Sequence, residues 1–297
     1  MSFTNSFVNP VVRGVINPLK TITQKKELHF ESRFRNNYGS LSDNPASFNY
    51  TLPNEIDDVV SLRLSSIHIP NAIYLISSAS KNNIFYINEE DTPRTISSGN
   101  YSLANIHTAF ETAIAIGGVS VTGDLNNDGK TIITNLSGND ITIHFYKQNE
   151  CTNFMNTLGW ILGFRTASVT IPNGSKATSS GIFDDGTTDY LYLEVDDFQR
   201  NVSNNNIVYL NKSTTNNNIL GKVYKCPPDG TYKLNLCYDG YTNSEKTRRY
   251  YGPVRLSKFK FSLLDKFGNL VDLNNMDFSF TLEADVLYER DNVTIPC

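Results

Sequence analysis

The side chains of this chain best suited to chemistry are few and scattered. The histidines stand far apart, at His29, His68, His107 and His144. Because no two of them lie four residues apart, a zinc site built within one element is not indicated. His68 alternates with Ile67 and Ile69, which predicts a strand residue that points to solvent or to a neighbour. Nothing in the sequence orients it as a general acid or base.

The remaining reactive groups form no catalytic constellation. The cysteines lie at Cys151, Cys226, Cys237 and Cys297, with no C-x-x-C spacing, so we expect reduced thiols and leave open whether Cys226 and Cys237 pair. The chain has neither a G-x-S-x-G motif nor a P-loop. Acidic side chains gather at 89–91, 184–185 and 196–197, which favours solvated loops over a glycosidase pair. We therefore predict no catalytic residue, no cofactor and no small-molecule substrate.

One segment matches the first half of a calcium loop. Asp124, Asn126 and Asp128, followed by Gly129, fit the pattern D-x-N-x-D-G. The position where an EF-hand needs a bidentate glutamate holds Asn135, and no flanking helices are expected there. Asp-Gly also favours a tight hairpin. We interpret the segment as a hairpin turn and predict no metal site.

Charge and hydropathy exclude further classes. The chain has 26 basic and 30 acidic residues, a net charge of -4, and no dominant basic stripe, so nucleic-acid binding is not expected. The short clusters at 25–26 and 246–249 are interpreted as solvated loops. No apolar run is long enough for a transmembrane helix. The first residues lack the pattern of a secretory signal.

These side chains would be positioned by strands. Asn accounts for 36 of the 297 residues, and there are 17 Phe and 16 Tyr, which favours many strands joined by Asn-rich turns. Apolar residues alternate at 48–52, 60–64, 191–195, 259–263 and 278–288, and Pro53 is expected to end the first of these runs. A slip at Ser65-Ser66 predicts a β-bulge. The fold class is predicted as mainly β, with an antiparallel sandwich.

A different pattern interrupts the strands. Apolar residues at helical spacing predict a helix over 103–114, with Ser102 as its N-cap and Gly117-Gly118 as its stop, and a second helix over 151–164. Short strands are expected at 119–121, 131–134 and 141–145. We therefore divide the chain into an N-terminal extended arm (1–26), a sandwich core (27–95 and 173–290), an inserted α+β subdomain (96–172) and a C-terminal tail (291–297). The Asn-rich residues 199–218 are expected to form a long surface loop.

Several segments, taken in order, resemble one protein family. Glu31-Ser32-Arg33-Phe34-Arg35 resembles an opening that has Asp at the first position. Further similar blocks are Phe48–Pro53, Val59–Leu64, Ile69–Asn71, Asn82–Phe85, Gly99–Tyr101, Leu158-Gly159, Leu162–Phe164, Asp265–Asn269, Asp272-Leu273 and Asp277–Glu283. Their order resembles that of the minor capsid proteins of nucleocytoplasmic large DNA viruses, which are large icosahedral viruses with internal membranes. The similarity spans most of 28–290, but covers 1–26 and 199–250 poorly.

The resemblance implies a jelly-roll-like sandwich in a non-enzymatic viral structural protein. Such a subunit links or stabilises major capsid protein capsomers in the shell. Its partners would be those capsomers and other minor capsid proteins, it would reside in the virion after assembly in the host cytoplasm, and its proximity to an internal viral membrane is left open. Two alternatives remain at this point: a pentameric vertex (penton) protein and a glycan-binding surface module.

Overall fold

The chain divides into two compact units. The computed structural model describes residues 22–40, 43–123, 128–147, 153–184, 190–202, 208–211, 214–216, 218–224 and 247–288. Unit 1 comprises Met1–Ala72 and Asp189–Cys297, and unit 2 comprises Ile73–Thr188. Unit 2 begins earlier and ends later than the predicted insertion of 96–172. Strand pairing explains this difference, because segments at 84–87, 94–95 and 175–178 pair with strands of unit 2.

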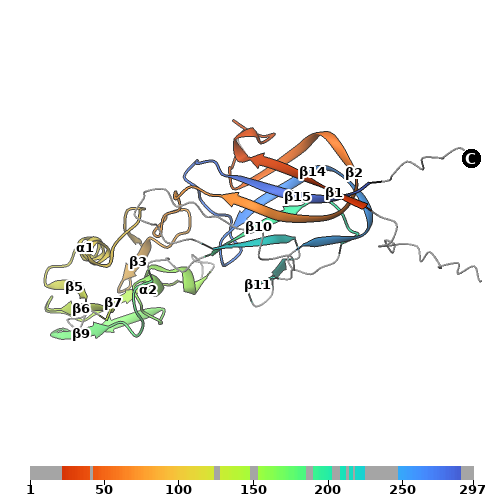
Figure 1. The fold of residues 1–297 in the computed structure, drawn as a ribbon. Coiled ribbons are helices and arrows are strands. Elements are labelled where there is room, and N and C mark those ends of the chain that lie inside the picture. The colour runs from red at the N-terminus through yellow and green to blue at the C-terminus, as the bar shows by residue number, and fades with distance from the viewer. Residues whose placement is uncertain are drawn as a thin grey trace, which may run out of the picture. The chain divides into compact units, whose positions relative to one another are not determined.

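Unit 1 is built around one antiparallel sheet of six strands (Figure 1). Its order is β1-β15-β2-β14-β10-β13, with bounds β1 (Ile22–Glu31), β15 (Ser279–Tyr288), β2 (Ser47–His68), β14 (Arg248–Leu264), β10 (Tyr190–Asp196) and β13 (Ile219–Tyr224). Strands from the two ends of the chain lie side by side, red and orange beside blue in Figure 1. Most neighbours in the sheet are therefore far apart in the sequence.

The sheet folds over its own apolar face. Phe30 of β1 contacts Phe259 and Phe261 of β14, with ring centroids 5.5 and 4.8 Å apart, although β15 and β2 separate these strands in the sheet. At Gly221 of β13, a Cβ atom would lie 2.7 Å from Cδ2 of Leu64 on β2. These contacts across the core confirm the predicted mainly β, jelly-roll-like antiparallel sandwich.

β2 is longer than its sequence pattern predicted. Pro53 does not end the strand, because it lies where the pairing with β14 shifts register between Thr51 and Ile56 and no ladder N–H is needed. The predicted bulge at Ser65 is confirmed, since Thr281 and Leu282 of β15 pair with Ser66 and Leu64 and skip it.

Three other expectations for unit 1 change. Residues 22–26 are not part of an arm, because they belong to β1 and pair with residues 284–288 of β15. The predicted loop 199–218 contains a hairpin of β11 (Val208–Asn211) and β12 (Thr214–Asn216), and Val208 packs on an apolar cluster with Tyr192. The basic segments 25–26 and 248–249 belong to β1 and β14, so the solvated-loop interpretation is wrong for them. Residues 1–21 and the predicted tail 291–297 lie outside the described residues.

Unit 2 is a small α+β unit with its own core. One sheet has the order β4-β3-β7-β8 and a second the order β5-β6-β9. The bounds are β3 (Ile84–Ile87), β4 (Arg94–Thr95), β5 (Val119–Gly123), β6 (Thr131–Asn135), β7 (Ile141–His144), β8 (Ser168–Ile171) and β9 (Ser175–Thr178). Helix α1 (Leu103–Ile114) buries Ile106, Phe110 and Ile114 in the shared core. Among the described residues, no helix is long and apolar enough to cross a bilayer.

The first helix of unit 2 follows its predicted span and N-cap but not its predicted stop at Gly117-Gly118, and the second predicted helix is not continuous. Ser102 caps α1 by accepting a hydrogen bond from the Asn105 N–H, as predicted, and the helix stops at Ala115, which adopts a left-handed conformation. The predicted helix 151–164 is broken into a 3-10 turn, Phe154–Asn156, and α2 (Leu158–Ile161). Asn153 and Thr157 each accept a backbone N–H bond and begin a new turn, which divides the apolar pattern.

Candidate interaction site at the Ser32–Ser40 turn

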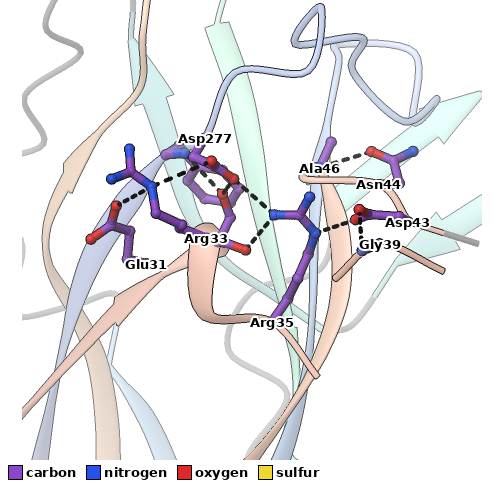
Figure 2. A network of polar contacts seen from close by, with 10 residues as sticks. Glu31, Arg33, Arg35, Gly39, Asp43, Asn44, Ala46 and Asp277 are labelled. Carbon is purple, nitrogen blue, oxygen red and sulfur yellow. Dashed lines mark hydrogen bonds and ion pairs between the residues drawn. The ribbon is translucent and has the colours of Figure 1, made fainter. Parts of the chain in front are cut away.

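A buried ion network follows the last residue of β1 (Figure 2). Arg35, whose side chain is 6% exposed, donates from Nη1 to Asp277 Oδ1 (2.8 Å) and to the Ser32 carbonyl (2.6 Å), and from Nε to Asp43. Ser32 Oγ donates to the same Asp277 oxygen (2.8 Å) and accepts from the Phe278 N–H (3.0 Å). The network therefore ties the 3-10 turn after β1 to the residues that lead into β15.

The charges of this network stabilise one another. Burial lowers the pKa of Arg35, but the hydrogen bonds and charges of Asp43 and Asp277 outweigh it, so the pKa lies above its usual value. The hydrogen bond from Arg35, followed by one from the Gly39 N–H (2.7 Å), holds the pKa of Asp43 below its usual range. The Arg35 guanidinium and the Asp43 carboxylate are thus charged at neutral pH, and the network fixes the turn.

The fixed turn presents aromatic side chains to solvent. Phe34 and Tyr38 are 66% and 64% exposed, and the guanidinium of Arg35 lies 4.5 Å from the centre of the Tyr38 ring. Arg33 is also exposed, 3.4 Å from Glu31. Aromatic residues and arginine are the types most enriched at the centres of protein interfaces. A rigid turn that exposes them is suited to binding a partner.

A shallow groove lies on the sheet where β1, β15 and β2 adjoin. It encloses about 240 Å³ and is lined by His29, Ser66, Ile67, His68, Ser279, Phe280 and Thr281. The fold thus brings together two histidines that are distant in sequence, from β1 and β2, on either side of β15. His68 is exposed, as predicted.

The groove is poorly arranged for catalysis. His29 Nδ1 lies 3.0 Å from Thr281 Oγ1 and His29 Nε2 lies 3.7 Å from Glu27 Oε2, which is the order of a hydroxyl, an imidazole and a carboxylate. However, the side chains of His29 and Glu27 are 72% and 62% exposed. Bulk water therefore screens their interaction and competes with any substrate. Among the described residues, no cluster of three or more potential metal ligands occurs.

The other predicted site residues are dispersed. Asp124 and Asn126 lie outside the described residues, as do all four cysteines, so the plain-turn interpretation stays a prediction. Asp128 accepts the Lys130 N–H at 3.1 Å and is paired with the Lys130 ammonium at 3.1 Å. His107 is buried on α1 against Thr131 (3.0 Å), and burial lowers its pKa.

Sequence reasoning missed a second buried network in unit 1. Asp197 accepts hydrogen bonds from Arg248 Nη1 (2.8 Å) and from the Tyr250 hydroxyl (2.5 Å). Burial, followed by the charge of Asp197, raises the pKa of Tyr250 above its usual range. Asp197 is not the solvated acid that its pair with Asp196 suggested. A charged residue at the end of an alternating strand was the only local signal, and it does not identify a partner 51 positions away.

Comparison with known proteins adds a structural likeness. No protein-family model matches the chain, and no curated protein matches it. Among solved structures, the crystal structure of the selenomethionine-labelled mavirus penton protein is similar, with a TM-score of 0.46 and 12% sequence identity. The similarity covers 89% of this chain and 100% of the penton chain. A TM-score below 0.5 does not establish a shared fold, so the sandwich described above rests on its own geometry.

Proposed function

We propose that this chain is a structural protein of a viral capsid. In its specific form, the proposal is a minor capsid protein that links or stabilises the capsomers of the major capsid protein in a large icosahedral DNA virus. It carries no catalytic activity and needs no cofactor. Its partners are the major capsid protein and other minor capsid proteins, and its location is the virion shell.

The observation that supports this proposal is that the first and the last of the similar sequence blocks meet in the fold. Arg35 belongs to the first similar block and Asp277 to the last, and the two residues are 242 positions apart. They form one buried ion pair within the network that fixes the Ser32–Ser40 turn. The inward residues of the first block thus hold the fold together, while Phe34 from the same block faces solvent.

A buried framework with exposed contact residues suits assembly better than catalysis. A shell subunit needs a rigid framework that presents contact residues, and each contact is weak because the lattice repeats it many times. Phe34 and Tyr38 are anchors of that kind, held by charges beneath them. We propose that this turn binds a neighbouring capsid protein.

The glycan-binding alternative has one observation in its favour and one against it. Tyr190 and Tyr224 of unit 1 lie together, with ring centroids 6.3 Å apart, as a sugar-stacking platform would require. The ammonium of Lys222, however, lies 3.5 Å from the centre of the Tyr190 ring and 5.1 Å from that of Tyr224. The cation covers ring faces on which a sugar would stack. We therefore favour assembly.

The proposal is tested in purified particles. Cryo-electron microscopy is expected to locate the chain in the shell between or beneath capsomers. A location at the five-fold vertices would replace the minor capsid assignment with the penton alternative. Absence of the chain from purified particles would refute a capsid role altogether.

The contact turn is tested by paired substitutions. Phe34→Ser with Tyr38→Ser should lower incorporation into particles while the purified chain stays folded, with at most a small fall in its thermal midpoint from the lost Arg35–Tyr38 contact. Phe198→Ser is the matched control, because Phe198 is an aromatic residue 47% exposed on another loop of unit 1. Equal incorporation of the two variants would show that the turn is not the contact.

A further inference from the structure

Strand β1 forms an open edge of the sheet in unit 1. Its ten residues pair with β15 without a register shift. In the part of the chain that the structure describes, no strand pairs with the opposite side of β1. A long and regular edge strand is a template for another strand, because half of its backbone N–H and C=O groups point outward.

The register identifies the outward-facing groups. The Ser32 N–H donates to the Phe278 carbonyl at 2.9 Å, so these two residues form a hydrogen-bonded pair. Hydrogen-bonded and non-hydrogen-bonded pairs alternate along an antiparallel ladder. The even-numbered residues of β1 therefore bond to β15, and the outward backbone groups belong to Thr23, Lys25, Glu27, His29 and Glu31. The side chains of the last four are between 36% and 72% exposed.

The charges on this edge select one register for a second copy of β1. In an antiparallel pair centred on Leu28, Lys25 lies opposite Glu31 of the second copy and Glu27 lies opposite His29 of the second copy. Two-fold symmetry forms each pair twice, and the two Leu28 side chains meet at the axis, in a non-hydrogen-bonded pair where side chains are closest. Both outward-facing sets of backbone groups are then satisfied.

Other registers bring like charges together. Centring the pair on Lys26 places two lysines at the axis, and centring it on Glu27 places two glutamates there. Centring it on His29 places Glu27 opposite Glu31. Charged residues on an edge strand ordinarily prevent pairing. On β1 the outward-facing residues include the cation Lys25 and the anions Glu27 and Glu31, so their charges disfavour these registers and favour the one centred on Leu28.

We propose that this chain self-associates through β1, antiparallel across a two-fold axis at Leu28, so that one sheet continues through two copies. The interface is isologous, and each copy contributes the same residues. It belongs to the class of recognition by strand addition, in which main-chain hydrogen bonds give affinity and side-chain pairs give register. The proposal does not depend on the capsid role, because it concerns the purified chain alone.

Charge exchange tests the register by sedimentation equilibrium of the full-length chain. The wild type is expected to be dimeric, and Lys25→Glu or Glu31→Lys alone should weaken the dimer by about tenfold or more, because each creates two like-charged cross-strand pairs. The double variant should restore it. Lys25 also pairs with Glu283, and Glu31 with Arg33, within the same chain. The double variant loses those two pairs within the chain as well. A restored dimer would therefore be due to the charge pairs between copies.

Two further variants test the strand and its register. Lys26→Glu is the matched control, because Lys26 lies opposite Phe30 of the second copy in the proposed register. The dissociation constant of the Lys26→Glu dimer should equal that of the wild-type dimer. Glu27→Pro removes an outward-facing N–H but no bond to β15, so it should abolish the dimer and keep the folded monomer, whereas Glu27→Gln should retain a dimer. A wild-type chain that stays monomeric at all concentrations would overturn the proposal. So would a dimer that is unaffected by Lys25→Glu and Glu27→Pro.

Discussion

Replacing Arg35 by methionine should destabilise unit 1 strongly. Methionine has a similar length and no charge, so the substitution removes the guanidinium and leaves most of the space filled. The change leaves Asp43 without its cation, leaves Asp277 with only the more distant Arg33 at 3.7 Å, and removes the hydrogen bond to the Ser32 carbonyl. Arg35 is the centre of the network, so no single remaining contact replaces it.

The size of the effect follows from the burial of the three charged groups. Breaking a buried ion pair by removing one partner costs about 3–5 kcal/mol, mainly because the other charge remains without compensation. Here Asp43 and Asp277 keep 23% and 19% of their side chains exposed, so water partly solvates them. We therefore expect a loss of about 2–4 kcal/mol in the free energy of unfolding. With a urea m-value of ~2 kcal/mol/M, the midpoint should fall by about 1–2 M.

Urea unfolding followed by far-UV circular dichroism measures this loss. Arg255→Met is the matched control, because Arg255 also pairs with two carboxylates, those of Glu55 and Asp57, but its side chain is 64% exposed. Its midpoint should not move measurably. The single tryptophan, Trp160, lies in unit 2, so its fluorescence follows that unit separately. Equal midpoints for Arg35→Met and Arg255→Met would refute the assignment of the network as the support of the turn.

Two other predictions concern acid stability and packing. Burial raises the pKa of Glu283, but hydrogen bonds from Arg63 (2.6 Å) and Lys25 (2.5 Å) outweigh burial, so the net pKa lies below its ordinary value. This carboxylate therefore contributes stability above its ordinary pKa, and the contribution is lost as pH falls through the lowered value. Glu283→Gln should therefore be less stable than the wild type at pH 7 and lose less stability on acidification, which urea midpoints between pH 7 and 3 would measure; parallel curves would contradict this. In unit 2, a Cβ at Gly159 would lie 2.3–2.7 Å from the Phe145 side chain, so Gly159→Ala should lower the free energy of unfolding by about 1–3 kcal/mol, measured by Trp fluorescence. A Cβ at Gly174 would meet no atom within 4 Å, so Gly174→Ala should lose less stability despite the positive φ of Gly174.

Much of the sheet could be predicted because its strands obey a local rule. Phe278, directly before β15, and residues 280, 282, 284 and 286 of β15 are buried, as their alternation predicted, whereas Tyr288 at the end of the same series is exposed. The slip at Ser65 marked a real bulge. Pro53 misled because proline ends a regular ladder but is compatible with an irregular one. The broken helix at 154–161 misled because the apolar spacing is helical, while Asn153 and Thr157 redirect the backbone through hydrogen bonds that spacing does not reveal.

The interaction site was beyond sequence reasoning for a physical reason. Its network joins Arg35 to Asp277, and no local pattern couples residues that meet only after the chain ends have paired. Charged side chains in a predicted strand or turn are ordinarily solvated. The resemblance identified both segments as similar to a family, but it did not distinguish an inward-facing Arg35 from an outward-facing Phe34. That distinction depends on the 3-10 turn Ser32–Phe34, which contains Phe34 and ends at Arg35.

The network and the open edge act on the same strand, which links stability to association. Arg35 and Ser32 bind Asp277 immediately after Glu31, so they hold the carboxyl-terminal end of β1 against the start of β15. A strand whose end is fixed loses less conformational entropy when a second strand adds to it. Because Glu31 belongs to one of the selective charge pairs, its position must be constrained for the register to be specific. The buried charges therefore do more than stabilise a turn: they hold both the exposed aromatic residues and the edge strand in a form ready to bind.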